Sequence, residues 1–225
     1  RKDIIRGWIL KEELSFSPGK NELYSDLGFM LLEWIIEYIT NIKMRDFLIK
    51  LYAPLNLNKA FLSYPEHKIK RDEFAATGFC LWRKRIVQGE VHDENAFSMG
   101  GYSGHAGLFC TAMDVFIISD MLLGHYSGRR GDIFKRITLE EFFRKQNKRW
   151  TLGWDTPAPE SSSSGSLFSE NSVGHLGFTG TSIWMDLEKE IIIIFLTNRT
   201  YPTRQNEKIR QFRPIIHDTI MRELS

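Results

Sequence analysis

The chain of 225 residues has only two cysteines, Cys80 and Cys110. Neither lies in a C-x-x-C pair or in the spacing of a structural zinc site, so the sequence does not predict a metal held by thiolates. Two buried free thiols are the expected state. A disulfide between them stays open as the alternative, and with it the redox compartment.

The chain also lacks a long hydrophobic run and a strong net charge. Its most apolar stretch, residues 191–196, is far too short to span a bilayer, so no transmembrane segment is predicted. The formal net charge is +2, and the basic residues are scattered among acidic ones. Such a sequence has no strongly basic patch that would bind nucleic acid, and nucleic-acid partners are not expected.

Several common functional motifs are missing as well. The sequence has no G-x-S-x-G elbow, which argues against an α/β-hydrolase, and no P-loop or dinucleotide-binding fingerprint. No signal peptide is visible, and the chain begins at Arg1 directly in a helical pattern, which indicates the middle of a longer protein. A periplasmic, secreted or cytoplasmic location is compatible with this sequence, and the oligomeric state stays open.

Helical patterns dominate the first part of the chain. Apolar periodicity predicts helices around residues 4–9, over residues 27–40 and over residues 44–52, the last one stopping before Pro54. The second of these is apolar nearly all round and is expected to be a core helix. Residues 63–107 are irregular, which is typical of a functional loop or of a segment with short elements.

Two capping signatures follow the irregular stretch. Thr111 with Asp114 predicts the start of a helix whose apolar run ends at Gly124. Thr138 with Glu141 repeats the signature and predicts a short helix.

The signals for β-structure come late in the chain. Residues 159–166 contain four consecutive serines and a glycine, and a flexible surface loop is expected there. Residues 181–187 and 191–197 are rich in β-formers and flank a polar turn, which predicts a hairpin. The second strand is continuously apolar, so both of its faces are expected to be covered.

The tail closes the chain with a helix over residues 206–224, in which Pro214 either introduces a kink or opens the final segment. The order of helices, antiparallel hairpin and closing helix predicts an α+β fold. A chain of this length can bury one sizeable core or a two-part domain.

The first candidate site cluster is Tyr24, Ser25 and Asp26, at the entrance of the second predicted helix. A tyrosine there can be exposed on one side and packed on the other. If a cation lies near its oxygen, the pKa of the phenol falls and Tyr24 can act as a general base. The alternative is a half-buried tyrosine next to a Ser or Asp cap.

The second cluster spans residues 174–182 and leads into the hairpin. Its glycines, Gly174, Gly177 and Gly180, allow a ligand or another backbone to approach closely. His175 places a titratable group beside that opening. The alternative is a glycine-rich strand edge with a surface histidine.

The third cluster contains His92, Asp93 and His105. Their spacing fits no standard zinc pattern, and no third ligand is obvious. A hydrogen-bonded loop that braces a pocket is therefore expected here, and no metal.

These clusters belong to a longer ordered set of short segments, namely residues 18–19, 24–29, 54–57, 89–96, 105–109, 175–182 and 196–199. The ordered set covers nearly the whole chain and resembles the serine β-lactamase-related proteins. That family includes class C β-lactamases, penicillin-binding D,D-peptidases, esterases and amidases that act on cell-wall fragments. The resemblance implies a β-lactamase/transpeptidase-like fold, with a helical region and an antiparallel sheet flanked by helices.

The resemblance also implies one partial domain over residues 1–225. Its helical part with the long loop would span residues 1–150, and the sheet strands and closing helix residues 151–225. The N-terminal strands of the family's sheet would be missing, which would leave an unpaired edge that favours aggregation.

Family members use three motifs, S-x-x-K, Tyr-x-Asn or Ser-x-Asn, and K-T-G. The resemblance makes Tyr24 the proton-shuttling tyrosine of the second motif and puts Asp26 where the family often has Asn. It places His175 and Gly177 at the K-T-G strand. The backbone N–H of Phe178 would be one donor of the oxyanion hole.

Two departures bear on the substrate. Asp26, if ionised, cannot donate the hydrogen bond that an amide gives. Leu176 stands where members that bind lactams have a hydroxyl that helps to hold the substrate carboxylate. These features favour an ester, amide or peptide substrate, small or derived from peptidoglycan, over penicillin.

The nucleophile is not found in the chain. Its one S-x-x-K runs from Ser17 to Lys20, and Gly19 disfavours the helical turn that would bring the lysine under the serine. The resemblance puts the true motif upstream of Arg1. The full-length protein is thus expected to be a serine hydrolase that forms an acyl-enzyme without a metal or organic cofactor, and the chain alone to be inactive. The alternative is a non-catalytic binding or scaffold module.

Overall fold

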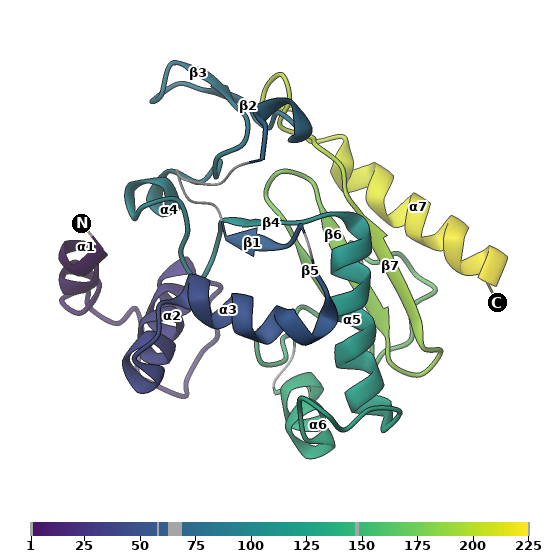
Figure 1. The fold of residues 1–225 in the computed structure, drawn as a ribbon. Helices are drawn as coiled ribbons and strands as arrows, with labels where there is room; N and C mark the ends of the chain where they lie inside the picture. Colours follow the sequence, from purple (N-terminus) through teal and green to yellow (C-terminus); the bar gives the residue numbers. More distant parts are fainter. Residues whose placement is uncertain (1, 58, 63–68, 147–148, 225) are drawn as a thin grey trace. The chain divides into compact units, whose positions relative to one another are not determined.

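The computed structural model describes residues 2–57, 59–62, 69–146 and 149–224 (Figure 1). The chain forms two compact units, Arg1–Cys110 and Thr111–Ser225. Cys80 and Cys110 do not form a disulfide; Cys80 is buried, as expected, whereas Cys110 is only half-buried. None of the helices within these ranges is long and apolar enough to cross a membrane.

The first unit is mainly helical, and its strands are short. Two antiparallel pairs, β1 with β4 and β2 with β3, lie within or beside the stretch that the sequence left irregular. The expectation of short elements in that stretch is confirmed for its described residues; residues 63–68 lie outside them. The elements of this unit are α1 (Lys2–Ile9), α2 (Asp26–Thr40), α3 (Met44–Tyr52), the 3-10 turn Ala53–Leu55, β1 (Phe61–Leu62), the 3-10 turn Arg71–Glu73, β2 (Gly78–Cys80), β3 (Arg85–Val87), α4 (Glu94–Ser98) and β4 (Leu108–Phe109).

Helix α2 is not the core helix that its apolar composition predicts. Its buried residues are Met30 and two acids, Glu33 and Glu37, which are 1% and 7% exposed. Tyr38 and Ile39 are 83% and 74% exposed. The reason is electrostatic: cations from α1 pair with the two glutamates, so the polar stripe of α2 faces inward and its apolar flanks face outward.

The second unit is a three-stranded antiparallel sheet in the order β5-β6-β7, with helices on both faces (Figure 1). The predicted hairpin is confirmed as β6 and β7. The polar turn between them is held by the Asp186 carboxylate, which accepts the N–H groups of Glu188 and Lys189. The elements are α5 (Ala112–Ser127), α6 (Arg136–Phe143), β5 (Val173–Leu176), β6 (Ser182–Asp186), β7 (Ile191–Phe195) and α7 (Ile209–Leu224).

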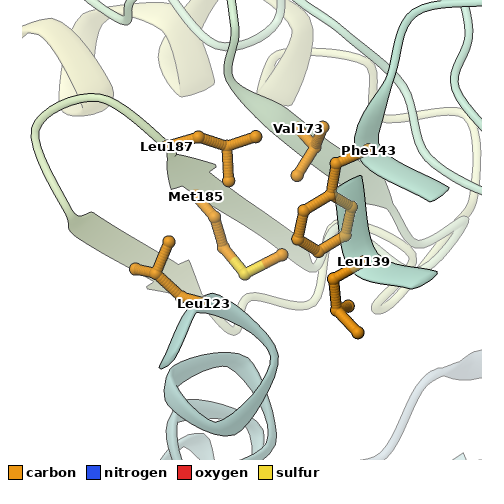
Figure 2. Close-up of a cluster of buried hydrophobic side chains, with 6 residues drawn as sticks. All are labelled: Leu123, Leu139, Phe143, Val173, Met185 and Leu187. Carbon is orange, nitrogen blue, oxygen red and sulfur yellow. The ribbon is translucent and has the colours of Figure 1, made fainter. Parts of the chain in front are cut away.

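Alternating side chains of the sheet divide its core into two layers. On one face, strand residues such as Val173 and Met185 pack against α5 and α6, as Figure 2 shows for Leu123, Leu139 and Phe143. The other face forms a second cluster, which comprises Phe168, Trp184, Ile193 and, from α7, Met221. Strand β7 contributes Ile192 to the first cluster and Ile191 and Ile193 to the second, so the prediction that both its faces are covered is confirmed.

The helix ends agree only in part with the sequence signals. Thr111 and Asp114 form the predicted capping box of α5. The helix does not end at Gly124, however; it continues to Ser127 and ends at Gly128, whose φ of 82° suits glycine. Thr138 is not a cap either, because α6 begins at Arg136, two residues before it. The second of the two capping signals is therefore wrong, and Lys135 occupies the N-cap position without a side-chain capping bond.

The serine-rich segment is ordered rather than flexible. Ser164 is fully buried, and its hydroxyl lies 2.7 Å from that of Ser162. Ser166 donates both its N–H and its hydroxyl to the carboxylate of Asp218 on α7, at 2.6 and 2.9 Å. These contacts fix a segment that composition alone indicates to be mobile. Helix α7 itself continues through Pro214, which lies inside the helix and does not open a separate segment.

Candidate active site

Tyr24 and Asp26 lie at the entrance of α2. Tyr24 precedes the helix with 58% of its surface exposed, and Asp26 is the first helical residue. An acid in the first turn interacts favourably with the helix dipole. Ser25 occupies the N-cap position with extended backbone and makes no side-chain capping bond. The entrance thus presents a phenol just before the helix and a carboxylate at its first residue.

His175 lies on β5, paired across the sheet with Ile183. Its Nδ1 is 3.0 Å from the carbonyl oxygen of Leu176. Because a carbonyl can only accept, Nδ1 carries a proton in this contact. The half-buried imidazole is therefore oriented by the backbone of the next residue.

A tight turn follows β5. Gly180 donates its N–H to Gly177 O at 2.9 Å, and Gly177 donates its own N–H to Thr181 O at 2.8 Å. A Cβ on Gly177 would displace the Thr181 hydroxyl, and Gly180 has a φ of 117°, a backbone conformation that favours glycine. Phe178, at the second position of this turn, is 56% exposed.

Two arginines donate hydrogen bonds to backbone carbonyls of this turn, and the sequence motifs did not predict a role for either of them. Arg199, shortly after β7, donates from Nε to Phe178 O at 2.8 Å. Arg213, buried on α7, donates from Nη2 to Gly180 O at 2.8 Å. The sequence could have indicated Arg199, because it ends the last segment of the ordered set. Nothing in the sequence indicated Arg213, because its acceptor is a backbone carbonyl, which every residue has.

The predicted residues thus fall into two groups. Tyr24 and Asp26 share one helix entrance in the first unit, while His175, Gly177 and Phe178 share one strand and turn in the second.

The third cluster is a hydrogen-bonded loop. Asp93 accepts the N–H of Ala96 at 2.7 Å, which caps α4, and lies 2.9 Å from Nε2 of His105. Burial alone would raise the pKa of Asp93, but these two bonds outweigh it and hold the pKa below its usual value. His92 meets the hydroxyl of Thr77 at 3.0 Å. The described residues hold no group of three or more His, Cys, Asp or Glu that could bind a metal.

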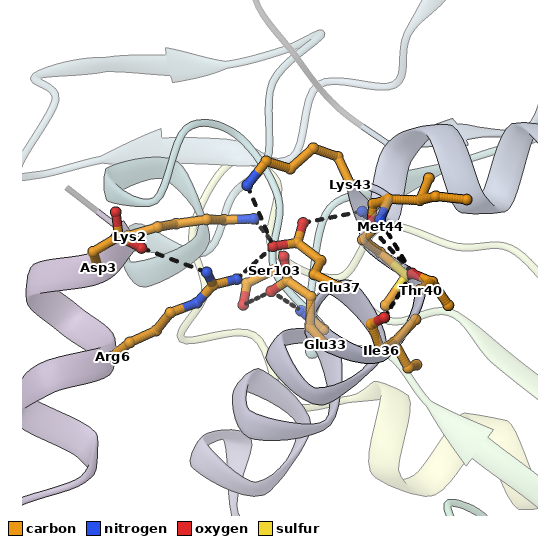
Figure 3. A network of polar contacts seen from close by, with 12 residues as sticks. Lys2, Asp3, Arg6, Glu33, Ile36, Glu37, Thr40, Lys43, Met44 and Ser103 are labelled. Atoms are coloured by element: carbon orange, nitrogen blue, oxygen red, sulfur yellow. Dashed lines mark hydrogen bonds and ion pairs between the residues drawn. The ribbon is translucent and has the colours of Figure 1, made fainter.

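A buried polar cluster, missed in the sequence, fixes α2 (Figure 3). Arg6 on α1 pairs with Glu37 at 2.7 Å, and Lys2 pairs with Glu33. Glu33 also accepts the Ser103 hydroxyl at 2.9 Å. The signal was present: residues 2 and 6 and residues 33 and 37 are both spaced i,i+4, so two cations on one helix match two acids on another.

The pKa of Glu37 records this pairing. Burial by itself would raise the pKa, yet the hydrogen bonds from Arg6 and from the N–H of Met44, with the charges of Lys2 and Lys43, hold it below its usual value. Glu37 is therefore a buried carboxylate that stays ionised at neutral pH.

Comparison with known proteins agrees with this architecture. The family model described as Beta-lactamase matches residues 3–215. N-acetylmuramyl-L-alanine amidase of Bacillus subtilis (strain 168) is 34% identical over 217 residues, which cover 89% of this chain and 49% of the relative. A Salmonella heidelberg (strain SL476) protein named "Putative D-alanyl-D-alanine carboxypeptidase" is 31% identical over 218 residues, covering 89% and 50%.

Among solved structures, a β-lactamase of Mycobacterium bovis superposes with a TM-score of 0.66 at 17% identity, covering 94% of this chain and 67% of the other. The fold is thus β-lactamase-like, as the ordered segments implied. The chain belongs to the beta-lactamase family. It spans about half the length of the curated relatives it matches.

Proposed function

We propose that the protein containing this chain is a serine hydrolase that cleaves an amide, peptide or ester bond through an acyl-enzyme. The observation that supports the proposal is the hydrogen-bonded turn after β5, in which Phe178 lies between Gly177 and Gly180, shortly after His175 in the sequence. Backbone donors fixed in this way suit the stabilisation of an oxyanion.

The proposed reaction uses a serine upstream of Arg1, in S-x-x-K. Its Oγ attacks the carbonyl carbon, the carbonyl oxygen becomes an oxyanion held by Phe178 N–H, and Tyr24 relays the serine proton to the leaving amine or alcohol. The carbon–leaving-group bond then breaks. Water attacks the acyl-enzyme ester and restores the serine, and His175 assists electrostatically in both steps.

The substrate class follows from the departures and from the relatives. Asp26 and Leu176 weaken the case for a β-lactam, and the matched relatives are named as an amidase and a carboxypeptidase. We therefore propose a small or peptidoglycan-derived substrate with a scissile amide or peptide bond. The reaction needs no metal or organic cofactor.

The deciding experiment treats the full-length protein with a fluorophosphonate probe and locates the label by mass spectrometry. Label on an upstream serine within S-x-x-K supports the acyl-enzyme proposal. A folded but unlabelled protein refutes it and favours the non-catalytic module.

Tyr24 is tested in the same protein. Tyr24→Phe is expected to lower the hydrolysis rate of a p-nitrophenyl ester about 10²- to 10⁴-fold, the range for a lost proton-transfer group. Tyr38→Phe, on the helix that Tyr24 precedes and 83% exposed, is the matched control and keeps its rate. Residues 1–225 alone are expected to show no hydrolysis above the Tyr24→Phe background; faster turnover by this chain would place a nucleophile within it.

A further inference from the structure

The turn of residues 177–181 carries the proposed oxyanion donor, and two consecutive peptide planes in it are locked. The first plane joins Gly177 to Phe178, and its carbonyl accepts the N–H of Gly180 at 2.9 Å. In a planar trans peptide the N–H points opposite to the C=O. The Phe178 N–H is therefore directed away from the inside of the turn.

The second plane joins Phe178 to Thr179, and Arg199 locks it. The guanidinium Nε donates to Phe178 O at 2.8 Å, and Cζ lies 4.7 Å from the centroid of the Phe178 ring. The backbone N–H of Arg199 donates to Thr179 O at 2.7 Å. With both flanking planes held, the φ and ψ angles of Phe178 are fixed.

Arg199 is itself anchored on its far side. Its Nη1 donates to the carbonyl oxygens of Arg204 and Asn206, at 3.0 and 3.2 Å. Three bonds from one planar guanidinium thus connect the segment before α7 to the turn. A lysine, with a single nitrogen on a flexible stem, cannot reproduce this forked geometry.

Arg213 holds the other end of the turn. Its Nη2 donates to Gly180 O at 2.8 Å and lies 3.4 Å from Thr181 O. Burial lowers the pKa of Arg213, and the nearby charge of Arg199 lowers it further. Two cations are therefore held close to one short turn, at a cost in mutual repulsion, where a negative oxygen would develop.

We infer that Arg199 is the positioning residue of the site, which sets the Phe178 N–H for the oxyanion by fixing the Phe178 carbonyl and ring. The inference rests on the proposed function. The turn needs such a device, because glycines at 177 and 180 leave it conformationally free and the Phe178 ring is mostly exposed.

The test uses the full-length protein, with Arg199→Met, Arg199→Lys and the control Arg210→Met. Arg210 is an exposed arginine of α7 that pairs with Glu207 at 3.0 Å. Active serines are first counted with the fluorophosphonate, and kcat per counted serine and KM are then measured with a p-nitrophenyl ester. Counting the labelled serines distinguishes a variant that is partly misfolded from a folded variant with a lower kcat.

Arg199→Met is expected to lower kcat per counted serine about 10- to 100-fold, as for a displaced oxyanion donor, with little change in KM. Inhibition by phenylboronic acid, whose tetrahedral adduct places an oxygen in the same hole, is expected to weaken by a similar factor. Arg199→Lys is expected to fall in between, and Arg210→Met to match the wild type.

The outcomes separate the two proposals. A wild type that takes no label refutes the proposed function and this inference with it. A labelled wild type whose Arg199→Met variant keeps kcat per serine and boronate affinity overturns only the positioning role. If Arg199→Met does not fold, Arg199→Lys decides: an unchanged kcat per serine overturns the role, and a reduced one with unchanged KM supports it.

Discussion

His217 is a buried histidine that the proposed reaction does not use. It lies on α7 without exposed surface, with Nδ1 3.1 Å from Ser163 O and Nε2 3.5 Å from the Ser182 hydroxyl. Burial lowers its pKa, and the charge of Arg213 adds to this, while the bond to Ser163 and the charge of Asp218 oppose it. The folded protein therefore holds the neutral imidazole.

This environment predicts a pH dependence of stability. Because the pKa is lower in the folded state, the unfolded chain binds the extra proton first as pH falls below about 6.5. The contribution of neutral His217 to the free energy of unfolding is therefore complete above that pH. It is lost as the pH falls below it, by at most about 1.4 kcal/mol per pH unit. Urea unfolding at pH 7.5 and 5.5 measures the loss.

The His217→Gln variant is expected to be less stable at pH 7.5 but to lose less on acidification than the wild type. Equal slopes for the wild type and His217→Gln would contradict the prediction.

Helix α1 is attached to α2 chiefly through charge. Arg6→Met leaves Glu37 buried without its closest cation, and we expect a local loss of about 3 kcal/mol, typical of a broken buried pair. Hydrogen exchange of the peptide spanning α1 measures it. The double variant Arg6→Met/Glu37→Met is expected to recover much of the protection; a double variant as labile as Arg6→Met would show that the charges are not coupled.

The sheet tolerates no side chain at Gly174 on β5. A Cβ there would overlap the Trp184 ring, which is fully buried. Gly174→Ala is expected to cost about 2 kcal/mol or more through overpacking, read as a lower melting temperature. Gly131→Ala, where a Cβ meets nothing within 4 Å, is the control and should be close to neutral. Equal effects would contradict this account.

Local sequence patterns were sufficient to predict an element where its formation depends mainly on its own residues. Helix α3 has the predicted bounds, and the capping box at Thr111 and the hairpin are where the sequence put them. Long-range contacts decided the failures. The inward face of α2 depends on cations about 30 residues earlier, and the order of the serine segment depends on Asp218, about 50 residues later. No local pattern contains such partners.

At the site, motif order gave the positions of His175, Gly177 and Phe178 on one strand and turn. It did not give the arginines behind them, because Arg199 and Arg213 bind backbone carbonyls, which every residue has. Side-chain partners can be guessed from residue types; carbonyl partners appear only once the fold is known.

The whole chain exposes apolar surface and strand edges. In the part of the chain that the structure describes, β7 is an outer strand of its sheet, and Leu196 just beyond it is 44% exposed. We expect residues 1–225 alone to self-associate at high concentration, as edge strands do. Leu196→Lys should reduce light scattering more than Leu14→Lys, at an exposed leucine remote from the strands in sequence. Equal reductions would point to general hydrophobicity.

Helix α7 holds segments that lie well before it in the sequence. Arg213 binds Gly180, His217 binds Ser163 and Asp218 binds Ser166. During synthesis the ribosome must therefore release α7 before the turn at 177–181 gains its bond from Arg213. A nascent chain halted before α7 would carry the sheet while Gly180, Ser163 and Ser166 still lack these three bonds.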